Sequence, residues 1–235
     1  MSYYEEACRG FLNAPFASEQ DEKMYNSSFQ EFIRAKWDKD EGISVDSLRK
    51  FSMKHINVAG TEIMLWKGDI TKLSIDSIVN AANESLLGGG GVDFAIHNAA
   101  GPTLVKECAT LGGCEVGEAK ITKGYYLPAK TVIHTVGPIL DGKNSPQPDM
   151  LAKCYESCLF VLQENGLRSI AYCCISCGFY GFPNDLAAET AFSSVISTIS
   201  SRRSSIDTIV FCVFDDNQEK AYHHVFDKYI KENTK

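Results

Sequence analysis

Asp93 and His97 are residues whose types and spacing could do chemistry. They lie four positions apart in "GGGGVDFAIHNAAG" and would share one face of a helix. A carboxylate near a helix start is stabilised in its ionised form, and an ionised carboxylate can act as a general base towards water. Asp93 could instead only stabilise the helix start. His97 could hold or tune Asp93, or it could simply pack in the core, and the sequence leaves both readings open.

Two glycine-rich segments follow predicted strands, and both could bind phosphate. One is Gly88–Gly91, and the other is "SCGFYGFP", Ser176–Pro183. Glycine lets a phosphate approach the main chain, and the following helix N-terminus offers unpaired N–H donors. No Gly-Lys-Ser/Thr of a Walker A loop follows the first segment, and Asp93 occupies the sixth position of the G-x-G-x-x-G fingerprint. We therefore predict two loops that clamp a diphosphate, with another purpose for Asp93.

Short apolar runs that alternate with helices must position these loops. This pattern is typical of an α/β sheet covered on both faces, and ligands of such sheets bind beyond the carboxyl ends of the strands. Strands are predicted within residues 61–70, 75–82, 131–137, 168–175 and 207–214. Helices are predicted from Val92, over about 149–164 and 185–200, and from Asn217.

The N-terminal segment has a different pattern. Residues 1 to about 52 read as helical and contain no credible strand, and Ser44 before "VDSLRKF" is placed as a helix N-cap. We therefore divide the chain into a helical extension over 1–55, packed on the main domain, and a main domain over 56–235.

Composition restricts the partners and the compartment. The net charge of −7 argues against a protein that holds nucleic acid through many phosphate contacts. Nine scattered cysteines, no signal peptide and no long apolar stretch indicate an intracellular protein, cytoplasmic and/or nuclear, that is neither secreted nor bound to membranes. Cys174-Ile-Ser-Cys177 could be a redox pair or half a zinc site, but no second pair completes such a site, so we interpret both cysteines as structural.

Several long blocks resemble one family in the same order. They are "GDITKLSIDSIVNAANESLLGGGGVDFAIHNAAGPTLVKEC", "GEAKITKGYYLPAKTVIHTVGP" and "CISCGFYGFP". The chain from about Gly68 to its C-terminus thereby resembles the MacroD-type branch of the macrodomain family, whose enzymes remove mono-ADP-ribose from proteins. The resemblance implies a three-layer α/β/α fold with a mixed central sheet. The N-terminal segment is similar, more weakly, to the extension of the animal MacroD proteins.

The resemblance also implies a role for each matching residue. Asp69 would read adenine, with support from the main chain of Ile70, and Phe214 would lie near the same base. Asn83 would hold the hydroxyls of the distal ribose, and Asp93 would activate water beside it. His97 matches a histidine of the family. The other implied ADP-ribose contacts are Gly88, Gly89, Gly90, Gly91, Val92, Ser176, Cys177, Gly178, Phe179 and Tyr180, of which Tyr180 would pack on the distal ribose.

Structural alternatives stand beside these roles. Asp69 could be an ordinary capping residue, and Asn80 fits a turn asparagine better than a ligand contact. His134, in a strand-like run, is interpreted as structural. The sequence also departs from the family pattern at Cys177, where Thr is usual, at Phe94, where a small residue is usual, and at Phe179, where a β-branched residue is frequent. These departures could alter affinity and substrate choice.

The resemblance favours a monomeric hydrolase that needs neither a metal nor a redox cofactor. Its substrates would be proteins that carry mono-ADP-ribose on Glu or Asp, and O-acetyl-ADP-ribose, which has the same kind of ester. One alternative is a reader that binds ADP-ribose and releases it unchanged; Asp93 argues against it, because a reader needs no group that activates water. An RNA-binding or scaffolding module is disfavoured by the acidic balance.

Overall fold

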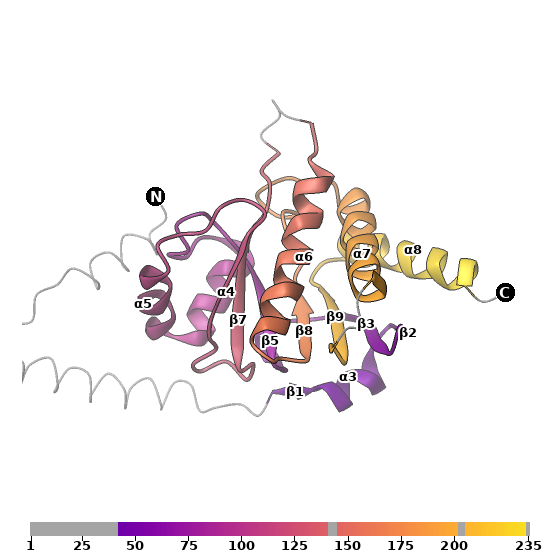
Figure 1. Ribbon diagram of the computed structural model, residues 1–235, viewed down its shortest axis with the longest axis horizontal. Helices are drawn as coiled ribbons and strands as arrows, with labels where there is room; N and C mark the ends of the chain where they lie inside the picture. The colour runs from indigo at the N-terminus through magenta and orange to yellow at the C-terminus, as the bar shows by residue number, and fades with distance from the viewer. Residues whose placement is uncertain (1–41, 141–144, 202–204, 234–235) are drawn as a thin grey trace, which may run out of the picture.

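Seven strands form one sheet in the computed structural model, which describes residues 42–140, 145–201 and 205–233 (Figure 1). The strand order is β2-β3-β9-β8-β5-β7-β6. The five inner strands are parallel, whereas the edge strands β2 and β6 run antiparallel to their neighbours. The predicted mixed sheet is therefore confirmed. Its strands are β2 (Lys54–Val58), β3 (Thr61–Lys67), β5 (Ser77–Ala82), β6 (Ala119–Lys123), β7 (Thr131–Val136), β8 (Ser169–Tyr172) and β9 (Thr208–Val213).

Helices cover both faces of this sheet. On one face, the ring of Phe192 in α7 contacts the rings of Phe211 in β9 and Phe226 in α8. Successive strand residues point to opposite faces, so Cys212 faces the other side, where it lines a cavity with Ala95 of α4. No helix among the described residues is long and apolar enough to cross a bilayer. The helices are α3 (Val45–Phe51), α4 (Gly91–Ala100), α5 (Pro102–Thr110), α6 (Pro148–Glu164), α7 (Asn184–Ser201) and α8 (Asp216–Asn233).

The predicted elements are largely confirmed. All five apolar runs contain a strand, and α4 and α8 each begin one residue before the expected position. The strand predicted over 61–70 is shorter, because β3 ends at Lys67 and a 3-10 turn, η1, follows at Ile70–Lys72. The sequence pattern did not predict β2, β6 and α5.

The chain enters the sheet domain through α3. Ser44 Oγ accepts a hydrogen bond from the main-chain N–H three residues later at 3.2 Å, which confirms the predicted N-cap. Ile43–Ser44 forms β1, a two-residue strand that pairs in parallel with β4 (Leu73–Ser74). The expectation that residues 1–52 contain no strand is therefore wrong at these two positions. The helices expected further upstream fall within residues 1–41, outside the described part of the chain.

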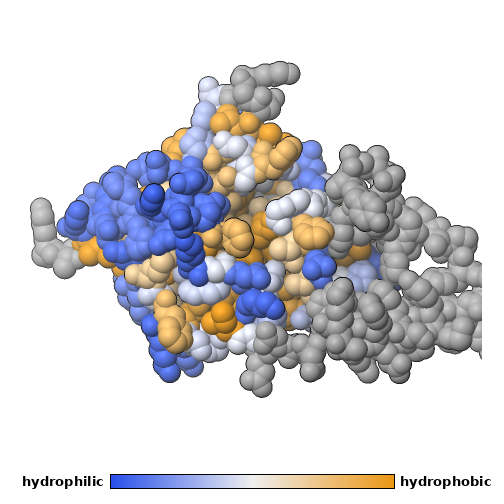
Figure 2. Space-filling view, turned by 180° about the vertical axis from the view of Figure 1, so that it is seen from behind, coloured by the Kyte–Doolittle hydropathy of each residue, from blue (hydrophilic) through white to orange (hydrophobic). Residues whose placement is uncertain are grey.

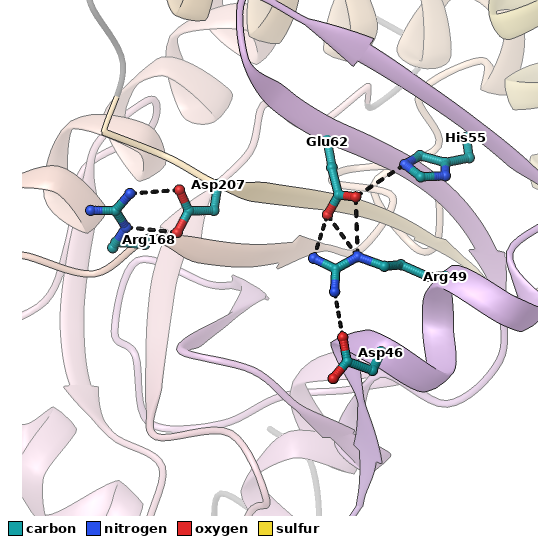
Figure 3. Close-up of polar contacts among 6 residues, drawn as sticks. All are labelled: Asp46, Arg49, His55, Glu62, Arg168 and Asp207. Atoms are coloured by element: carbon teal, nitrogen blue, oxygen red, sulfur yellow. Dashed lines mark hydrogen bonds and ion pairs between the residues drawn. The ribbon is translucent and has the colours of Figure 1, made fainter.

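Charged side chains join α3 to the sheet (Figure 3). Arg49 of α3 donates to both carboxylate oxygens of Glu62 in β3, with distances of 2.6–3.0 Å, and also bonds to Asp46. These hydrogen bonds from Arg49 lower the pKa of the Glu62 carboxyl. A second pair, Arg168–Asp207, links the residues that precede β8 and β9 at 2.6 and 2.7 Å. Both pairs tie together segments that are distant in sequence.

Burial, rather than charge, should dominate the attachment of α3. The Leu48 side chain is fully buried in the main core, whereas the Arg49 side chain is 42% exposed. We expect Leu48→Ala to lower the free energy of unfolding by about 2–5 kcal/mol, and Arg49→Ala by no more than about 1 kcal/mol. Urea denaturation of both variants measures this. A larger loss for Arg49→Ala than for Leu48→Ala would contradict the ranking.

Candidate active site

A cleft lies beyond the carboxyl ends of the inner strands, where the α/β arrangement predicts a ligand site. It consists of two cavities of about 510 and 390 Å³. They share four lining residues: Gly91, Val92, Cys174 and Gly178. A larger groove of about 620 Å³ runs between α7 and α8, but no strand end or glycine loop lines it. The two adjoining cavities therefore form the candidate site.

Asp93 lies in the first turn of α4 and lines the larger of the two cavities. Its side chain is buried, and Oδ1 accepts a hydrogen bond from Asn80 Nδ2 at 2.7 Å. His97 Nε2 lies 3.3 Å from the same oxygen, so the prediction that the two side chains share one helix face is confirmed, and the contact favours the reading in which His97 holds Asp93. A Cβ added to Gly89 would lie 3.0 Å from Asp93 Oδ2. Glycine at this position therefore leaves room for the carboxylate.

Asn80 differs from its expected role. We predicted a turn asparagine, but Asn80 lies inside β5, fully buried, and donates directly to Asp93. The prediction failed because the first asparagine of "NAAN" still belongs to the strand, whereas the second begins the loop. One feature of the sequence could have indicated the contact with a buried partner. Asn80 is polar in a largely apolar strand, and a polar side chain at such a position needs a buried hydrogen-bond partner.

Asn83 and Asp69 both serve turns and both line the cleft. Asn83 Nδ2 donates to Gly88 O at 2.9 Å, and its Oδ1 accepts from Ser85 N at 3.0 Å. Asp69 Oδ1 accepts from Thr71 N at 3.0 Å and caps η1. Asn83 lines the larger cavity, and Asp69 lines the smaller one. The turn contacts fix both side chains in the walls of the cleft, and their roles towards a ligand stay predictions.

The second glycine-rich loop closes the larger cavity from the other side. Ser176 adopts a φ of 63°, and its buried Oγ has no hydrogen-bond partner among the described residues. Ser176 O accepts from Phe182 N at 3.0 Å, which holds the two ends of the loop together. Tyr180 is half-buried in the cavity wall, and burial raises the pKa of its hydroxyl, as does the charge of Asp93. The loop thus presents a hydroxyl and an aromatic ring near Asp93.

Three predicted site residues line neither cavity: Gly88, His97 and Cys177. Gly88 and His97 lie behind the surface, where they contact Asn83 and Asp93. Phe179 and Phe214 line the cleft at its edge, with exposed fractions of 102% and 76%. Figure 2 shows the molecule from behind, with apolar surface in the middle of that face and hydrophilic surface beside it. The mouth of the cleft therefore carries aromatic side chains with unburied rings.

The cysteines near the cleft are protonated at neutral pH. Burial raises the pKa of Cys173 and of Cys177 to about 12, and it raises the pKa of Cys174 well above its ordinary value. A thiol needs to lose its proton before it acts as a nucleophile or a metal ligand. The interpretation of Cys174 and Cys177 as structural is therefore the one that the geometry favours.

Burial also sets the protonation of His134, which lies in β7. It lowers the pKa of His134 to about 3 from an ordinary 6.5, and the nearby His97 acts in the same direction. Below an ordinary histidine pKa, the unfolded chain binds a proton at this ring that the folded protein does not bind. The folded state therefore keeps its full stability above the unfolded pKa and loses stability as the pH falls. We expect unfolding free energy to fall by up to about 1.4 kcal/mol per pH unit between roughly pH 6.5 and 3 because of His134. Urea denaturation at several pH values should give a shallower slope for His134→Asn, and parallel curves would contradict the expectation.

Comparison with known sequences shows which family of proteins this chain resembles. Residues 79–191 match the family model described as Macro domain. The Macro domain-containing protein CT2219 of Chlorobaculum tepidum is 52% identical over 156 residues, which cover 66% of this chain and 90% of that protein. ADP-ribose glycohydrolase MACROD2 of Xenopus laevis is 52% identical over 170 residues, or 72% of this chain and 41% of that protein. ADP-ribose glycohydrolase MACROD1 of Bos taurus is 51% identical over 170 residues, with 52% of that protein covered. The chain therefore spans about half or less of these animal relatives.

Solved structures agree with the sequence comparison. The Trypanosoma brucei macrodomain in complex with ADP-ribose is 35% identical, with a TM-score of 0.72, and the match covers 95% of each chain. The Oceanobacillus iheyensis macrodomain with ADP is 36% identical, also with a TM-score of 0.72, over 76% of this chain and 97% of that one. Sequence identity, the α/β/α layers and a cleft at the strand ends all agree, and the chain belongs to the macro domain family.

Proposed function

We propose that this protein is a hydrolase that removes mono-ADP-ribose from Glu and Asp side chains of proteins. The observation that carries the proposal is the buried Asp93 carboxylate, held by Asn80 at 2.7 Å on the wall of the larger cavity. A carboxylate with a fixed orientation can align and activate a water molecule. The relatives named ADP-ribose glycohydrolase support the same chemistry.

The two cavities suit the two ends of ADP-ribose. We place the adenine in the smaller cavity, beside Asp69 and Phe214, and the distal ribose in the larger one, beside Asn83 and Asp93. The diphosphate would cross the shared residues, which include Gly91 at the start of α4, where helix N–H groups can bind an anion. The Trypanosoma brucei macrodomain solved with ADP-ribose supports this ligand.

The reaction adds water across the ester that joins the distal ribose to a carboxyl group. Asp93 would accept hydrogen bonding from the attacking water and take its proton as the ester bond breaks. The products are free ADP-ribose and the restored protein carboxylic acid. O-acetyl-ADP-ribose presents the same kind of ester, so it would yield ADP-ribose and acetic acid.

A reader that binds ADP-ribose without cleaving it is the second candidate. The glycine loops and the smaller cavity beside Asp69 would bind ADP-ribose equally well in a hydrolase and in a reader. Hydrolysis is favoured because Asn80 and His97 surround Asp93 inside the protein, an arrangement that a binding module does not need.

The deciding experiment uses the wild-type protein with three substrates. One protein carries mono-ADP-ribose on Glu or Asp, a second carries it on Arg, and the third substrate is O-acetyl-ADP-ribose. Chromatography measures released ADP-ribose, and calorimetry measures the affinity for ADP-ribose. We expect release from both esters and none from the arginine linkage.

The other outcomes are equally informative. Tight ADP-ribose binding without release from any substrate would make the protein a reader. Release from the arginine linkage alone would contradict the assignment of the ester as the cleaved bond.

A further inference from the structure

Buried polar side chains continue from Asp93 away from the cleft. Asn80, Asp93, His134 and Thr122 are each at most 3% exposed. Asn80 Nδ2 lies 2.7 Å from Asp93 Oδ1 and 3.1 Å from His134 Nδ1, and His134 Nε2 lies 2.9 Å from Thr122 Oγ1. These contacts form one continuous series of hydrogen bonds, which runs from the cavity wall through β5 and β7 to the edge strand β6.

Strand register brings these residues together. Asn80 and His134 are direct partners in the pairing of β5 with β7, so their side chains lie on the same face of the sheet. Thr122 of β6 is paired with Val132, two residues before His134 and therefore on the same face. Residues from three strands thus align behind the carboxylate.

The directions of the hydrogen bonds follow from the Asn80 amide. Its –NH₂ group has two hydrogens, and it approaches both Asp93 Oδ1 and His134 Nδ1. His134 Nδ1 must then accept, so it carries no proton. A neutral ring with a bare Nδ1 carries its proton on Nε2, which donates to Thr122 Oγ1. Burial keeps the ring neutral, since it lowers the pKa of His134 to about 3.

We infer that His134 is a positioning residue for Asp93, and that Thr122 fixes the tautomer in which His134 does this. The inference rests on the proposed function. A ring with a proton on Nδ1 would attract the amide oxygen of Asn80, because only that oxygen can accept. The amide would then turn its oxygen towards Asp93, where two acceptors repel each other. The tautomer of His134 therefore decides whether the catalytic carboxylate is held or repelled.

A buried metal ion is the competing explanation. His97, Cys108 and His134 each offer one ligand atom, and these atoms lie within 4.8 Å of one another. Cys108 Sγ is 3.7 Å from His134 Nε2, the same atom that lies 2.9 Å from Thr122 Oγ1. Burial raises the pKa of the Cys108 thiol to about 12, so the thiol keeps its proton in the metal-free protein. The hydrogen-bonded arrangement is the one these groups favour.

Four variants test the inference through turnover on the ester substrate and affinity for ADP-ribose. His134→Leu removes the acceptor and should lower kcat by about 10- to 100-fold, the loss expected when the hydrogen bond from Asn80 to the charged Asp93 carboxylate is weakened, while the dissociation constant changes by less than about 3-fold. His134→Asn offers an amide oxygen near the place of Nδ1 and should recover most of the loss. Thr122→Val, which keeps the shape of the side chain, should lower kcat by about 3- to 10-fold. Thr122→Ser keeps the hydroxyl and should therefore keep kcat near its wild-type value.

A double variant separates positioning from a merely structural role. If His134 acts through Asn80, adding His134→Leu to Asn80→Ala should lower kcat little further, because coupled residues are not additive. Multiplied losses, or a dissociation constant that rises in step with the loss of kcat, would overturn the inference. If His134→Leu does not fold, the contrast between Thr122→Val and Thr122→Ser decides the question, and equal rates for that pair would overturn it.

Two further results distinguish the ways in which the inference can fail. Stoichiometric zinc by elemental analysis of the purified protein, with activity lost on chelation, would make His134 a metal ligand instead. A wild-type protein that releases no ADP-ribose would overturn the proposed function, and this inference with it. An active wild type with unchanged turnover in His134→Leu would overturn the inference alone.

Discussion

Replacing Asp93 with alanine is expected to slow the release of ADP-ribose by about 10²–10⁴-fold, the usual contribution of a general base. The affinity for ADP-ribose should remain within about 10-fold, because the diphosphate and adenine contacts arise elsewhere in the cleft. Single-turnover release from the ester substrate and calorimetry with ADP-ribose measure the two effects separately.

Asp149 offers a matched control for this variant. It lies in the first turn of α6, as Asp93 lies in that of α4, but its side chain is exposed, outside both cavities. Asp149→Ala removes a helix-start carboxylate without touching the cleft, so activity should be retained. Asp93→Asn adds a second test, because its amide oxygen can still accept from Asn80 but cannot take a proton. Loss of turnover below 3-fold in both Asp93 variants would reduce Asp93 to a helix-stabilising residue.

Adding one methyl group to Gly137 is expected to weaken ADP-ribose binding by at least about 10-fold and to destabilise the fold by about 1–3 kcal/mol. A Cβ at this position would lie 2.1 Å from Ser176 Oγ and 2.7 Å from Ile175 Cγ2. Such contacts are too short to persist, so the side chains of Ile175 and Ser176 must shift, and we expect the start of the loop that carries them to shift as well. Calorimetry and thermal unfolding of Gly137→Ala measure the two losses.

The same loop provides the controls. A Cβ at Gly178 would meet nothing within 4 Å, so Gly178→Ala should leave the melting temperature nearly unchanged. Combining Gly137→Ala with Ser176→Ala removes the shortest contact and should recover part of the lost stability. Equal destabilisation by Gly137→Ala and Gly178→Ala would show that the crowding at Ser176 does not matter.

The sequence predicted those parts of the fold that are encoded locally. The inner strands are short apolar runs, and all six residues of β9 are buried, so their pattern stands out from the helices. The edge strand β2 was missed because "KHINV" is half polar and becomes a strand only by pairing with β3. The helix α5 was missed because it follows α4 immediately, with Gly101 at a φ of 81° ending one helix and beginning the next.

In the candidate site, too, the local contacts could be predicted from the sequence and the long-range contacts could not. Asp93 and His97 lie on one helix, so their spacing alone predicted that they would share one face of it. The contact between Asn80 and His134 joins residues 54 positions apart and depends on the register of β5 against β7. No local pattern contains that register, and the sequence therefore indicates only a structural role for His134. The contacts of Asp69 and Asn83 show turn roles, and their roles towards a ligand stay predictions.

The short boundary that the two cavities share, four lining residues, has a consequence for inhibitor chemistry. Gly91, Val92, Cys174 and Gly178 are all that the cavities share, so each can be filled without occupying the other. A small aromatic fragment near Phe214 and a polar fragment near Asn83 should bind together rather than compete. Joining them across these four residues would make the second contact intramolecular, so that two weak fragments could yield one tight inhibitor.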